Sequence, residues 1–147
     1  MSREIGYTYR VTTYKNSIYM NHNQDKKVLV VEDDRVLRRV IVDNLKSEGF
    51  TVMEAEDGAA GLATAVAEHP DLILLDVVMP KMDGIAMLEK LREDHWGKDA
   101  QVIMLTNLSD ADKVSFAAEK GVKDYLVKAD WDITSIIQKV KDKIRGL

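Results

Sequence analysis

Five polar residues stand directly after short apolar runs, and their types suit metal-assisted phosphoryl chemistry. Glu32 and Asp33 follow one run, and Asp76, Thr106 and Lys128 end or follow three others. Carboxylate oxygens are hard ligands that Mg²⁺ accepts together with water and phosphate oxygens. A carboxylate also acts as a nucleophile toward phosphorus, while an ammonium group offsets charge on the transferring group. Brought together, these residues would hold a phosphoryl group against Asp76.

The apolar runs that precede these residues predict buried β-strands. Continuous apolar runs of four to five residues, bounded by turn signals, are typical of strands covered on both faces in a parallel sheet. A further segment, Phe50–Ala55, predicts a weaker and more exposed strand. The four stronger runs are Val28–Val31, Leu72–Leu75, Gln101–Leu105 and Lys123–Val127.

Segments with helical periodicity separate the predicted strands. Helical spacing or composition marks Val36 to Gly49, Gly58–Glu68, Asp83–Asp94, Ala111–Lys120 and a last helix with its buried face from Ile133 to Ile144. We expect Asp34, Asp83 and Asp130 to cap three of them, since Asp accepts hydrogen bonds from free helix N–H groups. Five strands alternating with five helices predict an α/β fold, a (βα)5 doubly wound parallel five-stranded sheet. The carboxyl ends of such strands share one edge, where ligands bind.

Composition restricts the function classes. The chain has 147 residues, 46% hydrophobic and 31% charged, with no cysteine and a net charge of −4. Thiolate metal sites and thiol catalysis are therefore excluded. No segment is apolar enough for membrane insertion or a signal peptide, so we expect a cytoplasmic location. Without a clustered basic surface, we expect no direct nucleic-acid contact.

Residues 1–26 differ from the rest, and residues 27–147 are predicted to form one domain. Ile5–Tyr14 is rich in Tyr, Thr and Val, and a polar stretch leads from there to Lys26. We interpret residues 1–26 as an N-terminal extension that is flexible, or as one in which Met20 is the true start and the residues before it are not part of the protein. The three histidines lack ligand spacing and receive no catalytic role.

From about residue 27 to 145, the chain resembles the receiver domain of two-component response regulators, in the stand-alone form of a chemotaxis receiver. The resemblance rests on the acidic pair after the first strand and on the motif from Leu74 through Asp76 to Gly84. It also rests on spacing, since Thr106 lies 30 residues after Asp76 and Lys128 lies 22 residues after Thr106. The resemblance implies a flavodoxin-like sheet with strand order 2-1-3-4-5.

The resemblance also implies a role for each site residue. Asp76 is the phospho-acceptor, Lys128 pairs with the phosphoryl group, Thr106 and Tyr125 form the switch, and Mg²⁺ binds Glu32, Asp33, Asp76 and the backbone carbonyl of Val78. The phosphoryl group is expected to come from a sensor histidine kinase or a phosphotransfer protein. Such a domain is a switch that assists its own phosphorylation and is not an enzyme.

The expected output is a change of the face formed by the Ala111–Lys120 helix, the Lys123–Val127 strand and the last helix. A downstream protein effector reads this face, and the resemblance allows a phosphorylation-dependent homodimer. A receiver-fold scaffold that binds partners without phosphorylation is the main alternative. A haloacid-dehalogenase-like phosphatase would need a second acid where this chain has Val78, and a receiver detached from a DNA-binding regulator is a further alternative.

Three departures from the family pattern affect the expected behaviour. Proline usually follows the lysine in a cis peptide, but this chain has Ala129, so we expect a trans bond there. Asn107 replaces the usual small residue and is expected either to narrow access to Asp76 or to hold a water. Val78 and Leu108 flank the expected path of the hydrolytic water and cannot hydrogen-bond it. The phosphorylated state is therefore expected to be long-lived.

Overall fold

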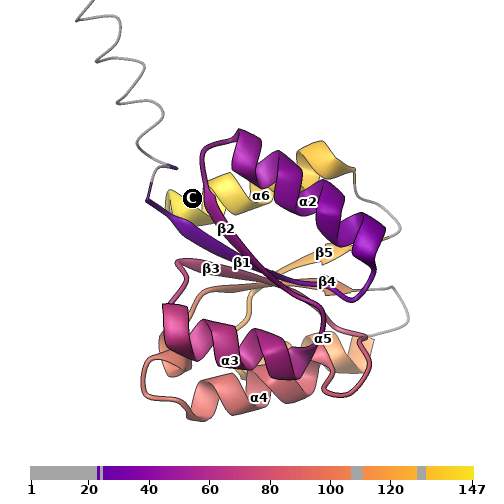
Figure 1. The fold of residues 1–147 in the computed structure, drawn as a ribbon. Helices are drawn as coiled ribbons and strands as arrows, with labels where there is room; N and C mark the ends of the chain where they lie inside the picture. The colour runs from indigo at the N-terminus through magenta and orange to yellow at the C-terminus, as the bar shows by residue number, and fades with distance from the viewer. Residues whose placement is uncertain (1–22, 24, 107–110, 129–131) are drawn as a thin grey trace, which may run out of the picture.

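A parallel five-stranded sheet with helices on both faces forms the domain (Figure 1). The computed structural model describes residues 23, 25–106, 111–128 and 132–147. All strand pairs are parallel, in the order β2-β1-β3-β4-β5, which confirms the predicted doubly wound fold and strand order. The strands are β1 (Lys27–Val31), β2 (Thr51–Ala55), β3 (Leu72–Asp76), β4 (Val102–Thr106) and β5 (Asp124–Val127).

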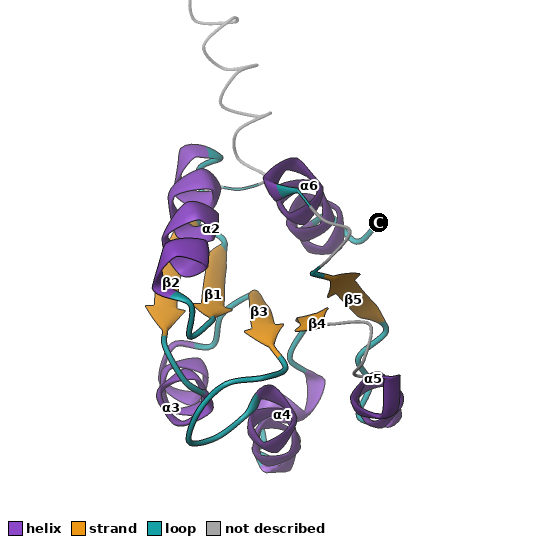
Figure 2. Cartoon of the chain, turned by 90° about the vertical axis from the view of Figure 1, so that its right-hand side faces the viewer, coloured by secondary structure: helices purple, strands orange, loops and turns teal. Residues whose placement is uncertain are grey.

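Four α-helices and one short 3₁₀ helix connect these strands in the described part of the chain, and a fifth α-helix follows the last strand. Helices α2 and α6 cover one face of the sheet, while α3, α4 and α5 cover the other (Figures 1 and 2). No helix among the described residues is long and apolar enough to cross a membrane. The helices are α2 (Arg35–Ser47), α3 (Gly58–Glu68), α4 (Gly84–Glu93), η1 (Gly97–Asp99), α5 (Ala111–Glu119) and α6 (Ile133–Ile144).

Alternating side chains of the strands divide the core into two layers. Leu29 and Val31 pack toward α3 and α4, while Val28 and Val30 pack toward α2 and α6. Because β1, β3 and β4 are covered on both faces, each of them reads as a continuous apolar run. β2 lies at the sheet edge and is only partly buried, as its weaker pattern indicates.

Aspartates cap the helices next to the site, and one predicted cap was wrong. Asp34 and Asp83 accept hydrogen bonds from backbone N–H groups in the first turns of α2 and α4, as predicted. For α6 the cap is Asp132 and not Asp130, because Asp132 Oδ1 accepts a hydrogen bond from Ser135 N at 2.7 Å. Asp130 itself lies outside the described residues.

Two of the apolar residues whose helical spacing predicts α2 do not face the core. Val36 and Val40 are 73% and 40% exposed, while Ile41, Val42 and Leu45 are buried.

Asn23, which belongs to the predicted N-terminal extension, is buried near the C-terminal end of α2. Its Nδ2 donates a hydrogen bond to Glu48 O at 2.8 Å. The extension therefore contacts the domain at least at this residue.

Candidate functional site

Four strands deliver the predicted site residues to one edge of the sheet. Glu32 directly follows β1, Asp76 ends β3, Thr106 ends β4, and Lys128 directly follows β5. The register pairs Asp76 with Leu105, so the ends of the two central strands lie nearly level. The backbone N–H of Lys128 donates to Thr106 O at 2.6 Å, which extends the β4–β5 pairing past the last strand residue.

One ammonium group lies between two buried carboxylates at this edge. Lys128 Nζ is 2.8 Å from Asp76 Oδ1 and 3.4 Å from Glu32 Oε2. Asp76 is 2% exposed and Glu32 is 1% exposed. Removing two carboxylates from water is costly, and a single cation offsets only part of that cost. The site is therefore short of positive charge.

The pKa values show the same imbalance. Burial, followed by the nearby charge of Asp76, raises the pKa of Glu32 to about 8. Burial also raises the pKa of Asp76, although the hydrogen bond and charge of Lys128 oppose this. Burial acts to lower the pKa of Lys128, but its hydrogen bond to Asp76 and the two carboxylate charges outweigh this effect and raise it. A further cation would stabilise the ionised form of both acids.

The donor set fits a divalent metal ion. Carboxylate oxygens of Glu32, Asp33 and Asp76 lie within 4.8 Å of one another, and Asp33 is exposed. Within the described residues, Glu32 Oε2 and Asp76 Oδ2 are buried without a hydrogen-bond partner. Mg²⁺ takes one or two carboxylates and keeps several waters, which suits a site that is buried on one side and open at Asp33.

Without Mg²⁺, we expect the protein to be more stable near pH 5.5 than near pH 8. The raised pKa of Glu32 means that the folded state keeps a proton that the unfolded state loses above about 4.5. Stability is therefore lost as pH rises through this range, by about 3 kcal/mol in the free energy of unfolding between pH 5.5 and pH 8. Urea denaturation in EDTA at both pH values measures the difference.

The carboxyl groups with lowered pKa values do not account for this loss of stability between pH 5.5 and pH 8. Asp57, Asp124 and Asp132 have lowered pKa values, so their contributions change only below about pH 4. Mg²⁺ is expected to raise stability more at pH 8 than at pH 5.5, and Glu32→Gln should reduce the pH dependence. Equal stability of the metal-free protein at both pH values would contradict the charge imbalance.

The loop after β3 holds its backbone close to Asp76. Val78 N donates to Asp76 Oδ1 at 3.4 Å, which places the backbone of Val78 beside the carboxylate. Gly84 N donates to Val77 O at 2.9 Å and closes the loop at its other end. A Cβ atom on Gly84 would lie 2.1 Å from Asp76 O. Only glycine therefore allows this approach of the α4 N-terminus to the end of β3.

Gly84→Ala is expected to destabilise the domain by about 2–4 kcal/mol, because the clash involves backbone atoms that cannot rotate away. Gly121→Ala is the matched control. Gly121 has φ of 83° but no atom within 4 Å of an added Cβ, so its cost should be about 1 kcal/mol. Denaturant titration compares both variants with the wild type, and a Gly84→Ala effect no larger than that of the control would contradict the clash.

The start of α3 supports the same loop through a contact that the sequence pattern did not predict. Gly58 N donates to Met82 O at 3.0 Å, and Lys81 Nζ lies 3.6 Å from Asp57 Oδ2. Asp57 also caps α3 by accepting a hydrogen bond from Ala60 N. The Asp57-Gly58 step resembles the Asp83-Gly84 step, and this repeated pair is the signal that could have indicated two helix starts meeting at one loop.

The structure thus brings together most of the predicted site. Glu32, Asp33, Asp76 and Lys128 form one cluster, and Thr106 is buried at the same edge. Tyr125 lies farther from the cluster on β5, opposite Met104, and is 49% exposed. Asn107, Leu108 and Ala129 lie outside the described residues, so the expectations about them, including the trans peptide, stay predictions.

Residues 28–141 match the family described as the response regulator receiver domain. A probable transcriptional regulator, ycf27 of Porphyridium aerugineum, is 39% identical over 105 residues, which are 71% of this chain and 42% of that protein. The DNA-binding dual master transcriptional regulator RpaA of Synechocystis is 34% identical over 81% of this chain and 49% of its own length. The chain spans less than half the length of these two relatives.

Solved structures show the same relationship. The CheY-like receiver domain protein of Methanospirillum hungatei aligns with a TM-score of 0.75 and 28% identity, over 82% of this chain and 94% of that chain. Chemotaxis protein CheY4 of Vibrio cholerae aligns with a TM-score of 0.72 and 28% identity, over 79% and 96% of the two chains. Fold, strand-end residues and sequence match agree, and the chain belongs to the response regulator receiver domain family.

Proposed function

We propose that this chain accepts a phosphoryl group on Asp76 from a phosphohistidine of a sensor histidine kinase or phosphotransfer protein. The observation that carries the proposal is the buried Asp76 carboxylate, which is paired with Lys128 and has an oxygen without a hydrogen-bond partner among the described residues. A carboxylate kept only for stability would be expected to have both oxygens satisfied.

In the proposed reaction, an Asp76 oxygen attacks phosphorus in line with the phosphorus–nitrogen bond of the phosphohistidine. That bond breaks, the imidazole nitrogen keeps the electron pair, and an acyl phosphate forms on Asp76. Lys128 lies within contact distance of Asp76 and offsets charge on the transferring group. Glu32, Asp33, Asp76 and the backbone carbonyl of Val78 would hold Mg²⁺, which supplies further positive charge when bound.

The proposed output is a change in the face formed by α5, β5 and α6. The phosphoryl oxygens attract the Thr106 hydroxyl, and Tyr125 moves inward from its half-exposed position. We propose that a partner protein reads this face and that the receiver itself does not contact nucleic acid. RpaA is named as DNA-binding, but this chain spans only 49% of its length.

Incubation with acetyl phosphate and Mg²⁺ tests the proposal, with mass spectrometry locating the added phosphoryl group. Uptake on Asp76 supports the phosphorylation switch. No uptake at any Mg²⁺ concentration would leave the alternative, a receiver-fold scaffold that binds partners without phosphorylation. That scaffold would be expected to lack the ion pairs that Lys128 makes with two buried acids.

We expect the phosphoryl group to persist for minutes or longer. Val78 is exposed beside Asp76 and offers no group that could orient a hydrolytic water. Val78→Asn should shorten the lifetime severalfold, whereas Val66→Asn, at an exposed valine of α3, should leave it unchanged. Quantifying phosphorylated protein after removal of the donor measures the lifetime, and a wild-type value of seconds would contradict this expectation.

A further inference from the structure

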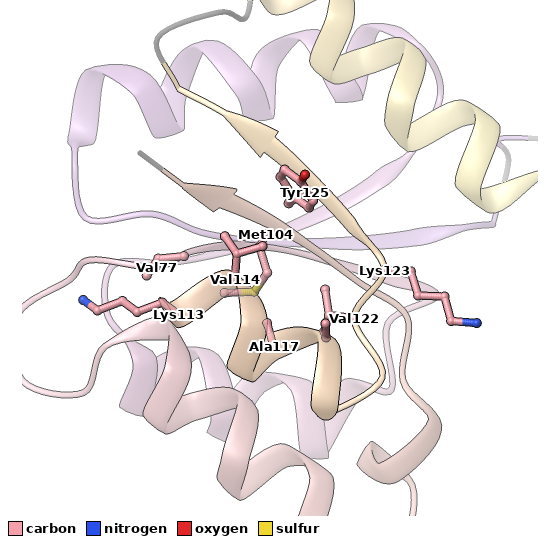
Figure 3. Close-up of a pocket in the computed structure, with 9 residues that line it drawn as sticks. Val77, Met104, Lys113, Val114, Ala117, Val122, Lys123 and Tyr125 are labelled. Atoms are coloured by element: carbon pink, nitrogen blue, oxygen red, sulfur yellow. The ribbon is translucent and has the colours of Figure 1, made fainter. Parts of the chain in front are cut away.

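A cavity of about 290 Å³ lies between α5 and the strands β4 and β5 (Figure 3). It begins at Val77, the residue after the proposed acceptor, and continues beneath α5 to the start of β5. The lining residues are Val77, Met104, Lys113, Val114, Ala117, Ala118, Val122, Lys123 and Tyr125.

The cavity exists because α5 covers the sheet loosely. Ala117 is the single buried residue of α5, whereas α4 buries Met87, Leu88 and Leu91. Val114 and Ala118 face the cavity and fill little of it, because their side chains are small. The space is near the lower limit of small-ligand pockets, about 300 Å³, and is too small for a helix.

The charged residues that line the cavity are both lysines. Its floor is apolar, with Val77 and Met104 each 1% exposed, and no acidic residue lines it. Lys113 lies beside Val77 at one end, and Lys123 lies at the other end, with both amines directed away from the floor (Figure 3). Neither lysine makes an ion pair within the described part of the chain, unlike Lys81 or Lys128. An apolar space with unpaired cations at both ends complements an amphipathic anion.

We infer that this cavity binds a small amphipathic anion, with its apolar body beneath α5 and its acidic group near Lys113 or Lys123. The size of the cavity favours a ligand with one or two rings or a short alkyl chain. Apolar burial supplies most of the affinity, and the lysines fix the orientation of the ligand.

The same cavity is adjacent to the switch, so its ligand would regulate phosphorylation. Tyr125 and Met104 are register partners on β5 and β4, and both line the cavity. Inward movement of the Tyr125 ring, which rests on the proposed function, would take up space that the ligand needs. Ligand binding therefore favours the outward ring and opposes phosphorylation, and phosphorylation weakens ligand binding by the same factor.

Titration of the unphosphorylated protein with 5-dimethylaminonaphthalene-1-sulfonate, a fluorescent aromatic anion with two rings, tests the site itself. We expect a saturable rise in fluorescence at one site per chain. Val114→Phe should fill the cavity from α5, and Ala118→Phe should block its mouth, each weakening binding at least tenfold. Val66→Phe, at an exposed valine of α3, is the matched control and should bind like the wild type.

Two further measurements distinguish binding in the cavity from non-specific binding elsewhere or to a partly unfolded variant. The ε-methyl NMR signal of Met104 should shift on titration, since Met104 forms the cavity floor. Thermal melting shows whether each variant is folded. If Val114→Phe is unfolded, a folded Ala118→Phe still tests the site. Absence of saturable binding, an unmoved Met104 signal, or wild-type affinity in folded filled variants would overturn the site.

Coupling is tested by repeating the titration after phosphorylation with acetyl phosphate and Mg²⁺, confirmed by mass spectrometry. The dissociation constant should rise at least about fivefold, the lower end of typical coupling between sites. Unchanged affinity in confirmed phosphoprotein would overturn the regulatory part of the inference. Failure of Asp76 to phosphorylate would instead overturn the proposed function, while the titration of the unphosphorylated protein would still decide the site.

Discussion

The Asp76→Asn variant is expected to take up phosphate from acetyl phosphate at less than about one thousandth of the wild-type rate. An amide is a far weaker nucleophile than a carboxylate, and removal of a covalent nucleophile typically costs several orders of magnitude. Asn has nearly the shape of Asp and removes a charge that burial disfavours, so the fold should be kept. Gel separation of phosphorylated from unphosphorylated protein measures the rate.

The matched control is Asp71→Asn, at the residue directly before the same strand, β3. Asp71 is exposed, and its Oδ2 accepts a hydrogen bond from Lys27 N at 2.8 Å, which an amide oxygen can also accept. This variant should phosphorylate like the wild type. Equal phosphate uptake by Asp76→Asn and the wild type would show that the acceptor is another residue.

The fold was predictable because its strongest signals are local. Runs such as Val28–Val31 and Leu72–Leu75 are apolar on both strand faces, and only a sheet covered on both sides buries them fully. Helix α3 has the predicted bounds, since the Pro70 that follows cannot continue the helix. The predicted proximity of Asp76, Thr106 and Lys128 followed from this fold, because the carboxyl ends of parallel strands lie at the same edge of the sheet.

Other features depend on contacts that periodicity does not encode. Val36 and Val40 belong to the apolar residues of α2, but each directly precedes a residue that packs on the core, Leu37 or Ile41, and therefore lies on a different, exposed side of the helix. Asp130 and Asp132 are equally good caps by residue type, and residue type alone does not show that α6 begins at Ile133, directly after Asp132. The pairing of Asp57 with Lys81 joins residues 24 positions apart and requires the packing of α3 against the loop.

The ion pairs and hydrogen bonds of the site could not be predicted from the sequence either. Lys128 was expected to pair with the phosphoryl group, but the sequence did not show that its ammonium contacts both Glu32 and Asp76. Nor did it show that each of those acids has a buried oxygen without a hydrogen bond. These facts depend on distances of a few ångströms, which follow from register and side-chain packing.

Lys128→Met is the second substitution with a large expected effect. Methionine keeps the apolar stem and removes the ammonium group, which leaves Glu32 and Asp76 buried without a cation. Loss of one partner of a buried ion pair costs about 3–5 kcal/mol, although proton uptake by the raised-pKa Glu32 relieves part of this. At pH 8 in EDTA, we therefore expect a loss of about 2–3 kcal/mol in stability.

Mg²⁺ should recover much of that stability, since a divalent ion near both acids replaces the missing charge. It should not recover the reaction rate, because Lys128 is the ammonium that contacts Asp76. We expect phosphorylation to be about 100-fold slower even in saturating Mg²⁺, the effect of removing one preorganised donor. Denaturant titration and phosphate uptake in the same buffer measure the two effects.

Lys90→Met, at an exposed lysine of α4 that makes no ion pair within the described residues, is the control and should change neither quantity. The two measurements separate the roles of Lys128. If Lys128→Met is destabilised but phosphorylates at the wild-type rate in Mg²⁺, the ammonium only neutralises buried acids. If Lys128→Met is as stable as the wild type but is phosphorylated slowly, the buried carboxylates are neutralised by another group and Lys128 acts on the phosphoryl group. Loss of both, with Mg²⁺ restoring only stability, is the result that the distances of 2.8 and 3.4 Å favour, because one ammonium contacts both acids.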